Sequence, residues 1–246
     1  MTTTTLVLLP GLDGTGILLA PQLHRLPPWI RPVVVEYPDA GANSYESLIE
    51  LVDAKVPQQG KFAILGWSFG GPLALMVAAR RPLQVSAVIL CATFVTPPIP
   101  KLVPFRFIAI TPVIFITRAF RRIRYVIPGF ASSELRRAKA TLWRRVDARV
   151  LAARSRAVLS VDARPLLKAC RAPLMYLASN DDDVVRRPSR DEVVAVAPQT
   201  QVCEIEGPHL ALFTNPVDAA ECIAKFLREV EAGPQTVEVG SSSFTH

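Results

Sequence analysis

The chain has 246 residues, of which 50% are hydrophobic and 20% charged, with a net charge of +7. This apolar content is enough for a sizeable core, so a disordered, collagen-like or coiled-coil chain is excluded. Residues 97–165 hold 15 Lys and Arg against 3 Asp and Glu, so the basic character belongs to one segment of the chain.

Six short apolar segments alternate with helical patterns along most of the chain. The apolar segments are continuous, and Gly, Pro, Asp or Asn bounds them, which is typical of strands buried on both faces of a parallel sheet. The expected strands are Leu6–Leu9, Val33–Glu36, Phe62–Leu65, Val88–Cys91, Leu174–Ala178 and Val202–Ile205. The expected helices are about Ser44–Lys55, Phe69–Arg80, Pro188–Val196 and Pro216–Val230. This order predicts an α/β fold with a mostly parallel, doubly wound sheet.

The segment 97–165 interrupts this alternation, because Arg-rich helical patterns take the place of the next strand. We expect an inserted helical cap over 97–165, a core formed by 1–96 and 166–232, and a disordered tail over 233–246. The apolar run Leu102–Phe120 contains two arginines and two prolines, which argues against a membrane span.

The four cysteines and the N-terminus bear on the cellular compartment. The cysteines lie far apart without short paired spacing, which suggests neither a zinc site nor a disulfide scaffold. The N-terminus has no basic region, and its apolar run is short and ends at Pro10, unlike a signal peptide. We therefore expect a cytoplasmic protein.

A Gly-Trp-Ser-Phe-Gly sequence at residues 66–70 follows an expected strand and precedes an expected helix. This is the G-x-S-x-G pattern in the strand–turn–helix context that it requires. The sharp turn would raise the Ser68 hydroxyl above the sheet, and Gly66 and Gly70 would avoid collisions with neighbouring elements. Ser68 is therefore the candidate nucleophile.

A serine hydroxyl needs a base to become a nucleophile, and the chain has three histidines. His246 is terminal, and His24 lies in an expected helix close behind the first turn. His209 follows the last expected strand, where a side chain can reach Ser68. His209 is therefore the candidate base.

A carboxylate that orients this histidine should follow the preceding strand. Three aspartates stand there, and each also fits a turn or helix-capping role. Spacing alone does not choose among Asp181, Asp182 and Asp183.

Acyl transfer needs two fixed N–H donors for the oxyanion. One should be the N–H of Phe69, the residue after the nucleophile. The other should come from the Gly-rich turn after the first strand, from Leu12. This turn fits neither a P-loop nor G-x-G-x-x-G, and the expected chemistry requires no metal or cofactor.

These motifs together resemble the α/β-hydrolase superfamily. The turn LPGLDGTG, the elbow GWSFGG, the ATF after Val88–Cys91, SNDDDVV and GPHLALFTNP occur in the family's order. The resemblance implies Ser68 as nucleophile and His209 as base, and the family pattern D-x-x-V favours Asp182 as the acid. It also implies a sheet trimmed at its N-terminal edge, because only five residues precede Leu6.

More closely, GWSFGG and the run 161–166 resemble the pimeloyl-carrier-protein methyl ester carboxylesterases, and LPGLDGTG resembles the plant phytyl-ester acyltransferases. The expected activity is hydrolysis of carboxylic esters with a medium-chain or hydrophobic acyl group. We expect Phe105, Phe107, Phe115 and Phe120 to pack the cap and line the acyl pocket. Acyl transfer or thioester hydrolysis on a carrier-bound acyl group, and a non-catalytic receptor, remain alternatives.

The basic residues of the cap, from Arg118 to Arg156, leave their partner open. An acidic carrier protein, an anionic membrane surface or an Arg-rich solvated helix face would each explain them. Nucleic acid is not expected, since no aromatic interleaving or binding motif accompanies the charge.

Overall fold

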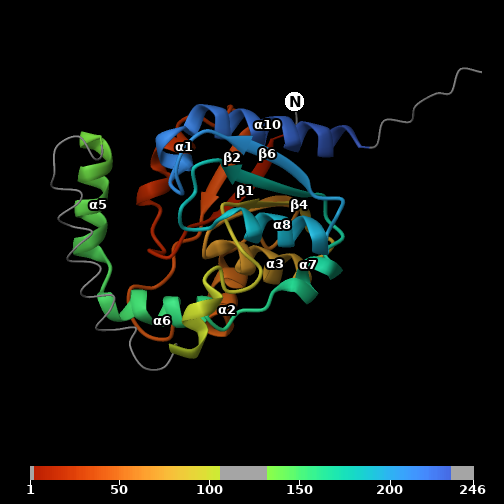
Figure 1. The fold of residues 1–246 in the computed structure, drawn as a ribbon. Helices are drawn as coiled ribbons and strands as arrows, with labels where there is room; N and C mark the ends of the chain where they lie inside the picture. Colours follow the sequence, from red (N-terminus) through yellow and green to blue (C-terminus); the bar gives the residue numbers. More distant parts are fainter. Residues whose placement is uncertain (1–2, 106–131, 234–246) are drawn as a thin grey trace, which may run out of the picture.

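A six-stranded parallel sheet runs through the middle of the protein (Figure 1). The computed structural model describes residues 3–105 and 132–233. The strands are β1 (Thr4–Leu9), β2 (Ile30–Val34), β3 (Phe62–Trp67), β4 (Val85–Cys91), β5 (Leu174–Ser179) and β6 (Gln201–Ile205). Their order is β2-β1-β3-β4-β5-β6, and each neighbouring pair is parallel. The expected doubly wound α/β fold is confirmed.

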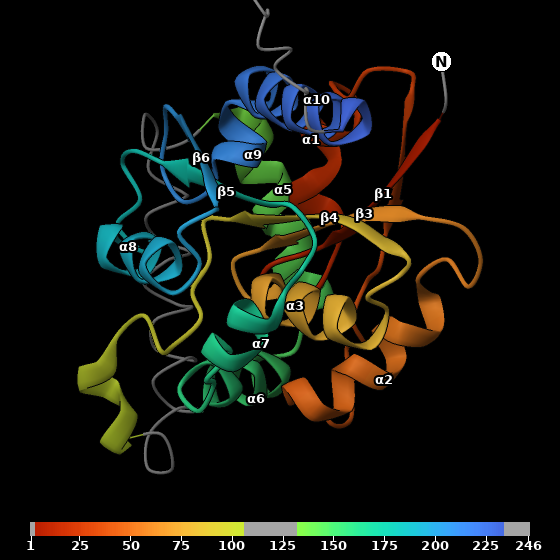
Figure 2. The same cartoon turned by 90° about the vertical axis from the view of Figure 1, so that its right-hand side faces the viewer.

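Helices cover both faces of this sheet (Figure 2). One face carries α2 (Tyr45–Lys55), α3 (Gly70–Arg80), α7 (Arg164–Ala169) and α8 (Arg187–Val196). The other carries α1 (Ala20–Leu23), α9 (Ala211–Thr214) and α10 (Pro216–Ala232). Two short 3-10 helices, η1 (Ile17–Leu19) and η2 (Pro100–Phe105), lie in connecting segments.

The core is divided into two layers because successive strand residues point to opposite faces. In β1, Val7 and Leu9 pack into one layer, and Leu6 and Leu8 pack into the other. All four are fully buried. A strand buried on both faces must be apolar at every position, which explains the continuous apolar runs of the sequence.

Strand β2 differs from its expected bounds, Val33–Glu36, because it begins at Ile30 and ends at Val34. It lies at the edge of the sheet, where Arg31 and Pro32 are exposed. An edge strand tolerates a proline, since one side of it has no neighbouring ladder to complete. Among the described residues, no strand pairs with the outer side of β2.

The expected cap segment contains two helices between β4 and β5, which are α5 (Ser133–Arg145) and α6 (Ala148–Val158). Ser132 caps α5 by accepting a hydrogen bond from the Leu135 N–H, and Asp147 caps α6 through the Arg149 N–H. Both helices lie outside the sheet, at one side of the molecule (Figure 1). Most of Leu102–Phe120 and the expected tail from residue 234 lie outside the described residues.

Within the described ranges, none of the helices is long and apolar enough to cross a bilayer.

One cysteine pair differs from the sequence expectation. Cys203 of β6 and Cys222 of α10 form a disulfide, with their Cα atoms 6.5 Å apart. The two residues are 19 positions apart in sequence, but α10 packs back against the sheet beside β6. Disulfides are typical of oxidising compartments, so this pair weighs against the predicted cytoplasmic location.

Candidate active site

Ser68 lies at the carboxyl end of β3, on a sharp turn into α3. Its φ of 52° is in the left-handed region, which is strained for a residue with a side chain. The Ser68 N–H donates to the Cys91 carbonyl at 2.9 Å, which ties the turn to the end of β4. The N-terminus of α3 begins directly behind Ser68, where its dipole favours negative charge.

The glycines around Ser68 allow a close approach of three backbones. A Cβ atom on Gly66 would lie 2.7 Å from the Gly70 carbonyl carbon, and one on Gly70 would lie 2.6 Å from the Leu9 oxygen. Both distances are shorter than a real Cβ contact allows. The collisions expected from the motif therefore exist, with α3 and with β1.

Ser68, His209 and Asp182 are hydrogen-bonded in series. His209 Nε2 lies 3.0 Å from Ser68 Oγ, and His209 Nδ1 lies 2.7 Å from Asp182 Oδ2. An ionised carboxylate can only accept, so Nδ1 carries the proton and Nε2 is left to accept from the serine hydroxyl. This tautomer is the one that a histidine base needs.

The structure separates Asp182 from the two aspartates beside it. Asp182 Oδ1 accepts the N–H groups of Val184 and Val185, both at 2.8 Å, so Oδ2 is directed at the histidine. The Asp182 side chain is 4% exposed, whereas Asp181 and Asp183 are exposed residues. Of the three candidates, Asp182 is the one that contacts His209.

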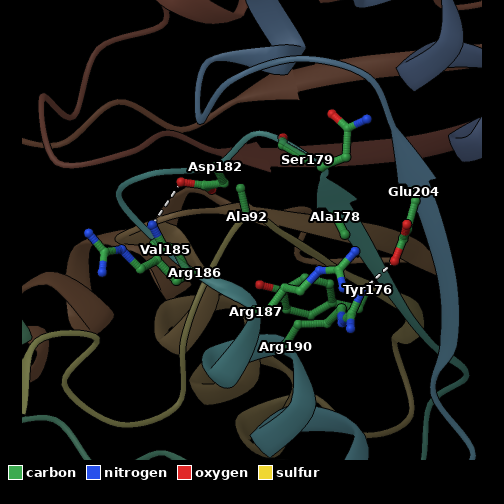
Figure 3. Close-up of a pocket in the computed structure, with 11 residues that line it drawn as sticks. Ala92, Tyr176, Ala178, Ser179, Asp182, Val185, Arg186, Arg187, Arg190 and Glu204 are labelled. Carbon is green, nitrogen blue, oxygen red and sulfur yellow. Dashed lines mark hydrogen bonds and ion pairs between the residues drawn. The ribbon is translucent and has the colours of Figure 1, made fainter.

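Figure 3 shows Asp182 bordering a small cavity whose far end holds the ion pair between Arg190 and Glu204. The cavity measures about 20 Å³, which is room for roughly one water molecule. It is therefore too small to hold an acyl group.

The His209 loop is held from two sides. Trp67, the residue before Ser68, donates its indole N–H to the His209 carbonyl at 3.3 Å. Asn180, in the Asp182 loop, accepts the Gly207 N–H at 3.0 Å, and Gly207 has a φ of 126° that favours glycine. The His209 loop is thus fixed to both the Ser68 turn and the Asp182 loop.

Thr93, just after β4, contacts the peptide whose N–H is the predicted Phe69 donor. Its hydroxyl donates to the Ser68 carbonyl, which belongs to the same peptide unit as the Phe69 N–H. The Tyr176 hydroxyl donates to the Thr93 carbonyl at 2.7 Å, and burial raises the pKa of this phenol above its ordinary value. Sequence reasoning missed both residues, although Thr93 belongs to the ATF segment that carried part of the family resemblance.

The Gly-rich turn after β1 lies next to Ser68. A Cβ placed on Gly11 would be 3.7 Å from the Ser68 Cβ. The Tyr37 hydroxyl donates to the Pro10 carbonyl at 3.0 Å, and the Gly14 N–H donates to the Gly11 carbonyl at 2.9 Å. The structure therefore brings the turn that contains Leu12 to the predicted nucleophile.

Of the other predicted residues, one lies elsewhere in the fold and the rest fall outside the described part of the chain. His24 is an exposed residue at the end of α1, and His246 lies outside the described residues, as do Phe107, Phe115, Phe120 and the Phe105 side chain. Within residues 3–105 and 132–233, no cluster of three or more His, Cys, Asp or Glu is arranged to hold a metal ion.

One basic residue in the span from Arg118 to Arg156 is not available to a partner. Arg154 is 1% exposed. Helix α6 directs this side chain toward the core, whereas its neighbours Arg149 and Arg156 are exposed.

Residues 5–221 match the model of a family described as the alpha/beta hydrolase family. The chain belongs to the alpha/beta hydrolase family. A stretch of 83 residues is also 35% identical to phytyl ester synthase 1, chloroplastic, from Arabidopsis thaliana, and covers 31% of this chain. It spans 12% of that relative's length.

Solved structures share the fold over nearly the whole chain. A carboxylesterase from the thaumarchaeon Nitrososphaera gargenis superimposes with a TM-score of 0.79 at 20% identity, covering 94% of this chain and 92% of that one. A thermophilic esterase from Thermogutta terrifontis gives a TM-score of 0.70 at 20% identity, covering 93% and 91%. The superfamily expected from the sequence is thus confirmed.

Proposed function

We propose that the protein is a serine esterase that cleaves carboxylic esters through an acyl-enzyme. The observation that carries this proposal is the series of two hydrogen bonds from Ser68 through His209 to Asp182. This series stands at the carboxyl edge of a parallel sheet in an alpha/beta hydrolase.

In the first half of the reaction, Ser68 Oγ attacks the ester carbonyl while His209 Nε2 takes the hydroxyl proton. Asp182 stabilises the imidazolium that forms. The tetrahedral intermediate then collapses, the carbon–oxygen bond to the alcohol breaks, and His209 returns its proton to the departing alcohol.

The negative charge of the intermediate falls on the former carbonyl oxygen. The backbone N–H groups of Phe69 and Leu12 are the proposed donors to this oxygen. Support for Phe69 is its place at the N-terminus of α3 and the anchoring of its peptide unit by Thr93. Support for Leu12 is the approach of its turn to Ser68.

In the second half, a water molecule attacks the acyl-enzyme and gives its proton to His209. The carboxylic acid leaves and Ser68 recovers its proton, which completes the cycle without a cofactor. We propose a medium-chain or hydrophobic acyl group, as in the pimeloyl esterases that the elbow resembles, since the cap segment is rich in apolar residues.

The test is hydrolysis of p-nitrophenyl esters of increasing chain length by the wild type and Ser68→Ala. We expect turnover by the wild type with an optimum at medium chain length, and loss of at least about 10³-fold in Ser68→Ala. Equal turnover by both proteins would contradict the proposal.

Acyl transfer to an alcohol is the second candidate, because the matched Arabidopsis relative is an ester synthase. The chemistry differs only in the second half, where an alcohol replaces water. Added long-chain alcohol would then yield a new ester at the expense of free acid. Free acid as the sole product at saturating alcohol would exclude this function.

A further inference from the structure

Helix α6 contributes a buried positive charge to the core. Arg154 is 1% exposed, although it lies in the most basic part of the chain. A buried charge costs free energy unless hydrogen bonds satisfy it. The partners of Arg154 therefore indicate what this side chain does.

Its hydrogen bonds in the described structure go to neutral oxygens. Nη1 donates to the Leu12 carbonyl at 2.9 Å, and Nη2 donates to the Pro38 carbonyl at 2.7 Å. Nε donates to Asn43 Oδ1 at 2.9 Å, and the guanidinium lies over the Tyr37 ring, 5.3 Å from its centroid. Burial lowers the pKa of Arg154 to about 10, so it remains protonated at neutral pH.

The contact with Leu12 is specific to the turn that faces Ser68. The proposed Leu12 donor belongs to the peptide unit between Gly11 and Leu12. Arg154 holds the carbonyl of the next unit, and the Tyr37 hydroxyl holds that of the preceding unit, at Pro10. The carbonyl of the donor unit itself accepts the Gly14 N–H. The peptide unit that carries the Leu12 N–H and the units before and after it are thus each held through their carbonyl by a hydrogen bond. These three bonds fix the orientation of the Leu12 N–H.

Gly14 makes room for this contact. Its φ is 71°, and a Cβ placed on it would lie 2.7 Å from the Arg154 guanidinium carbon. The turn therefore needs a glycine at this position both for its backbone conformation and for the approach of the arginine.

A second arginine of the cap segment reaches the same turn through a carboxylate. Arg145 of α5 pairs with Glu36 at 2.6 Å, and Glu36 accepts the Gly16 N–H at 2.8 Å. This pair is largely exposed and holds the far end of the turn, whereas Arg154 is buried and holds Leu12 itself.

We propose that Arg154 is a positioning residue for the esterase reaction, which sets the Leu12 N–H toward the oxyanion by clamping the carbonyl of Leu12 against Pro38 and Asn43. This role rests on the proposed function. It also makes α6 part of the oxyanion machinery rather than only a cover over the substrate.

The experiment compares Arg154→Met, Arg154→Lys and the control Arg156→Met, an exposed arginine on the same helix. We would measure kcat and KM on a p-nitrophenyl ester, and the inhibition constant of an alkyl trifluoromethyl ketone. This ketone forms a tetrahedral oxyanion adduct on a serine, so its affinity reports on the oxyanion site. Thermal unfolding would establish that each variant is folded.

We expect Arg154→Met to lower kcat by about 10- to 100-fold with little change in KM, since a small misplacement of a donor has this effect. The affinity for the ketone should fall by a similar factor. Arg154→Lys keeps the charge but not the forked guanidinium group. Its kcat and its affinity for the ketone should therefore lie between those of Arg154→Met and wild type. Arg156→Met should match wild type in all three quantities.

Unchanged kcat and ketone affinity in a folded Arg154→Met would overturn the proposal. If that variant does not fold, Arg154→Lys decides, and wild-type values of both quantities there would overturn it. A fall in stability without a fall in ketone affinity would assign Arg154 a purely structural role, which also overturns it. Failure of the proposed function is distinguishable, because the wild type itself would then hydrolyse no ester.

Discussion

The environment of each aspartate after β5 decides which one can serve His209. Asp182 accepts two backbone N–H groups through one oxygen and faces His209 Nδ1 with the other. Its two neighbours are directed to solvent. A carboxylate held in this way favours the imidazole tautomer with its proton on Nδ1, which is the role proposed for Asp182.

Replacing Asp182 by Asn should lower kcat by about 10³- to 10⁴-fold, because the amide would allow the wrong histidine tautomer. Asp181→Asn and Asp183→Asn serve as matched controls. Their kcat should stay within about twofold of the wild-type value, since both residues are exposed and do not contact His209. The measurement is steady-state ester hydrolysis by the three variants. Equal, mild losses in all three would place the acid elsewhere.

Thr93 offers a test of the Phe69 donor. Thr93→Val keeps the shape but removes the hydroxyl that holds the Ser68 carbonyl. Losing one such bond of about 1 kcal/mol should lower kcat by roughly fivefold with KM nearly unchanged. Thr93→Ser, which retains a hydroxyl, should recover most of the rate, and a rate in Thr93→Val equal to wild type would rule out this role.

At the scale of elements, the sequence predicts the existence of each strand better than its first residue, since β4 begins at Val85 rather than at Val88 and β2 at Ile30 rather than at Val33. β1, β3, β4 and β5 are covered on both faces, so their apolar runs stand out from the turns around them. β2 and β6 form the two edges, and exposed or polar residues break their patterns. The start of β2 was misplaced because Arg31 and Pro32 resemble a loop until the neighbouring β1 is known.

The link between β6 and α10 leads to a stability prediction. A disulfide that closes a loop of this length contributes about 3 kcal/mol. For a chain of this size, its removal should lower Tm by roughly 10 °C. Thermal unfolding of the Cys203→Ser/Cys222→Ser variant would measure this, with Cys170→Ser as the control. An unchanged Tm, or four titratable thiols in the unfolded wild type without reductant, would contradict the pairing.

At the scale of the whole molecule, the sequence indicates the candidate reacting residues, whereas the contacts around them emerge from the fold. Ser68 and His209 could be predicted because G-x-S-x-G and the last strand leave few alternatives. Thr93, Tyr37 and Arg154 could not, since each acts on a backbone carbonyl that is distant in sequence. A basic residue in a basic segment gives no sign that it is buried, and only the packing of α6 against the first turn reveals it.

The same view explains how one sheet assembles the site. Parallel strands bring their carboxyl ends to one edge, so Leu12 follows β1, Ser68 follows β3, Thr93 follows β4, Asp182 follows β5 and His209 follows β6. Helices α5 and α6 contact the turn after β1 through Arg145 and Arg154. The geometry of the candidate site is therefore a property of the strand order and not of any one segment.

The most direct test of Ser68 as the nucleophile is labelling of the folded protein with a fluorophosphonate, followed by intact-mass and peptide mass spectrometry. We predict one adduct per chain, located on Ser68 and absent in Ser68→Ala. A folded wild-type protein that takes up no label, or an adduct that persists in Ser68→Ala, would contradict it.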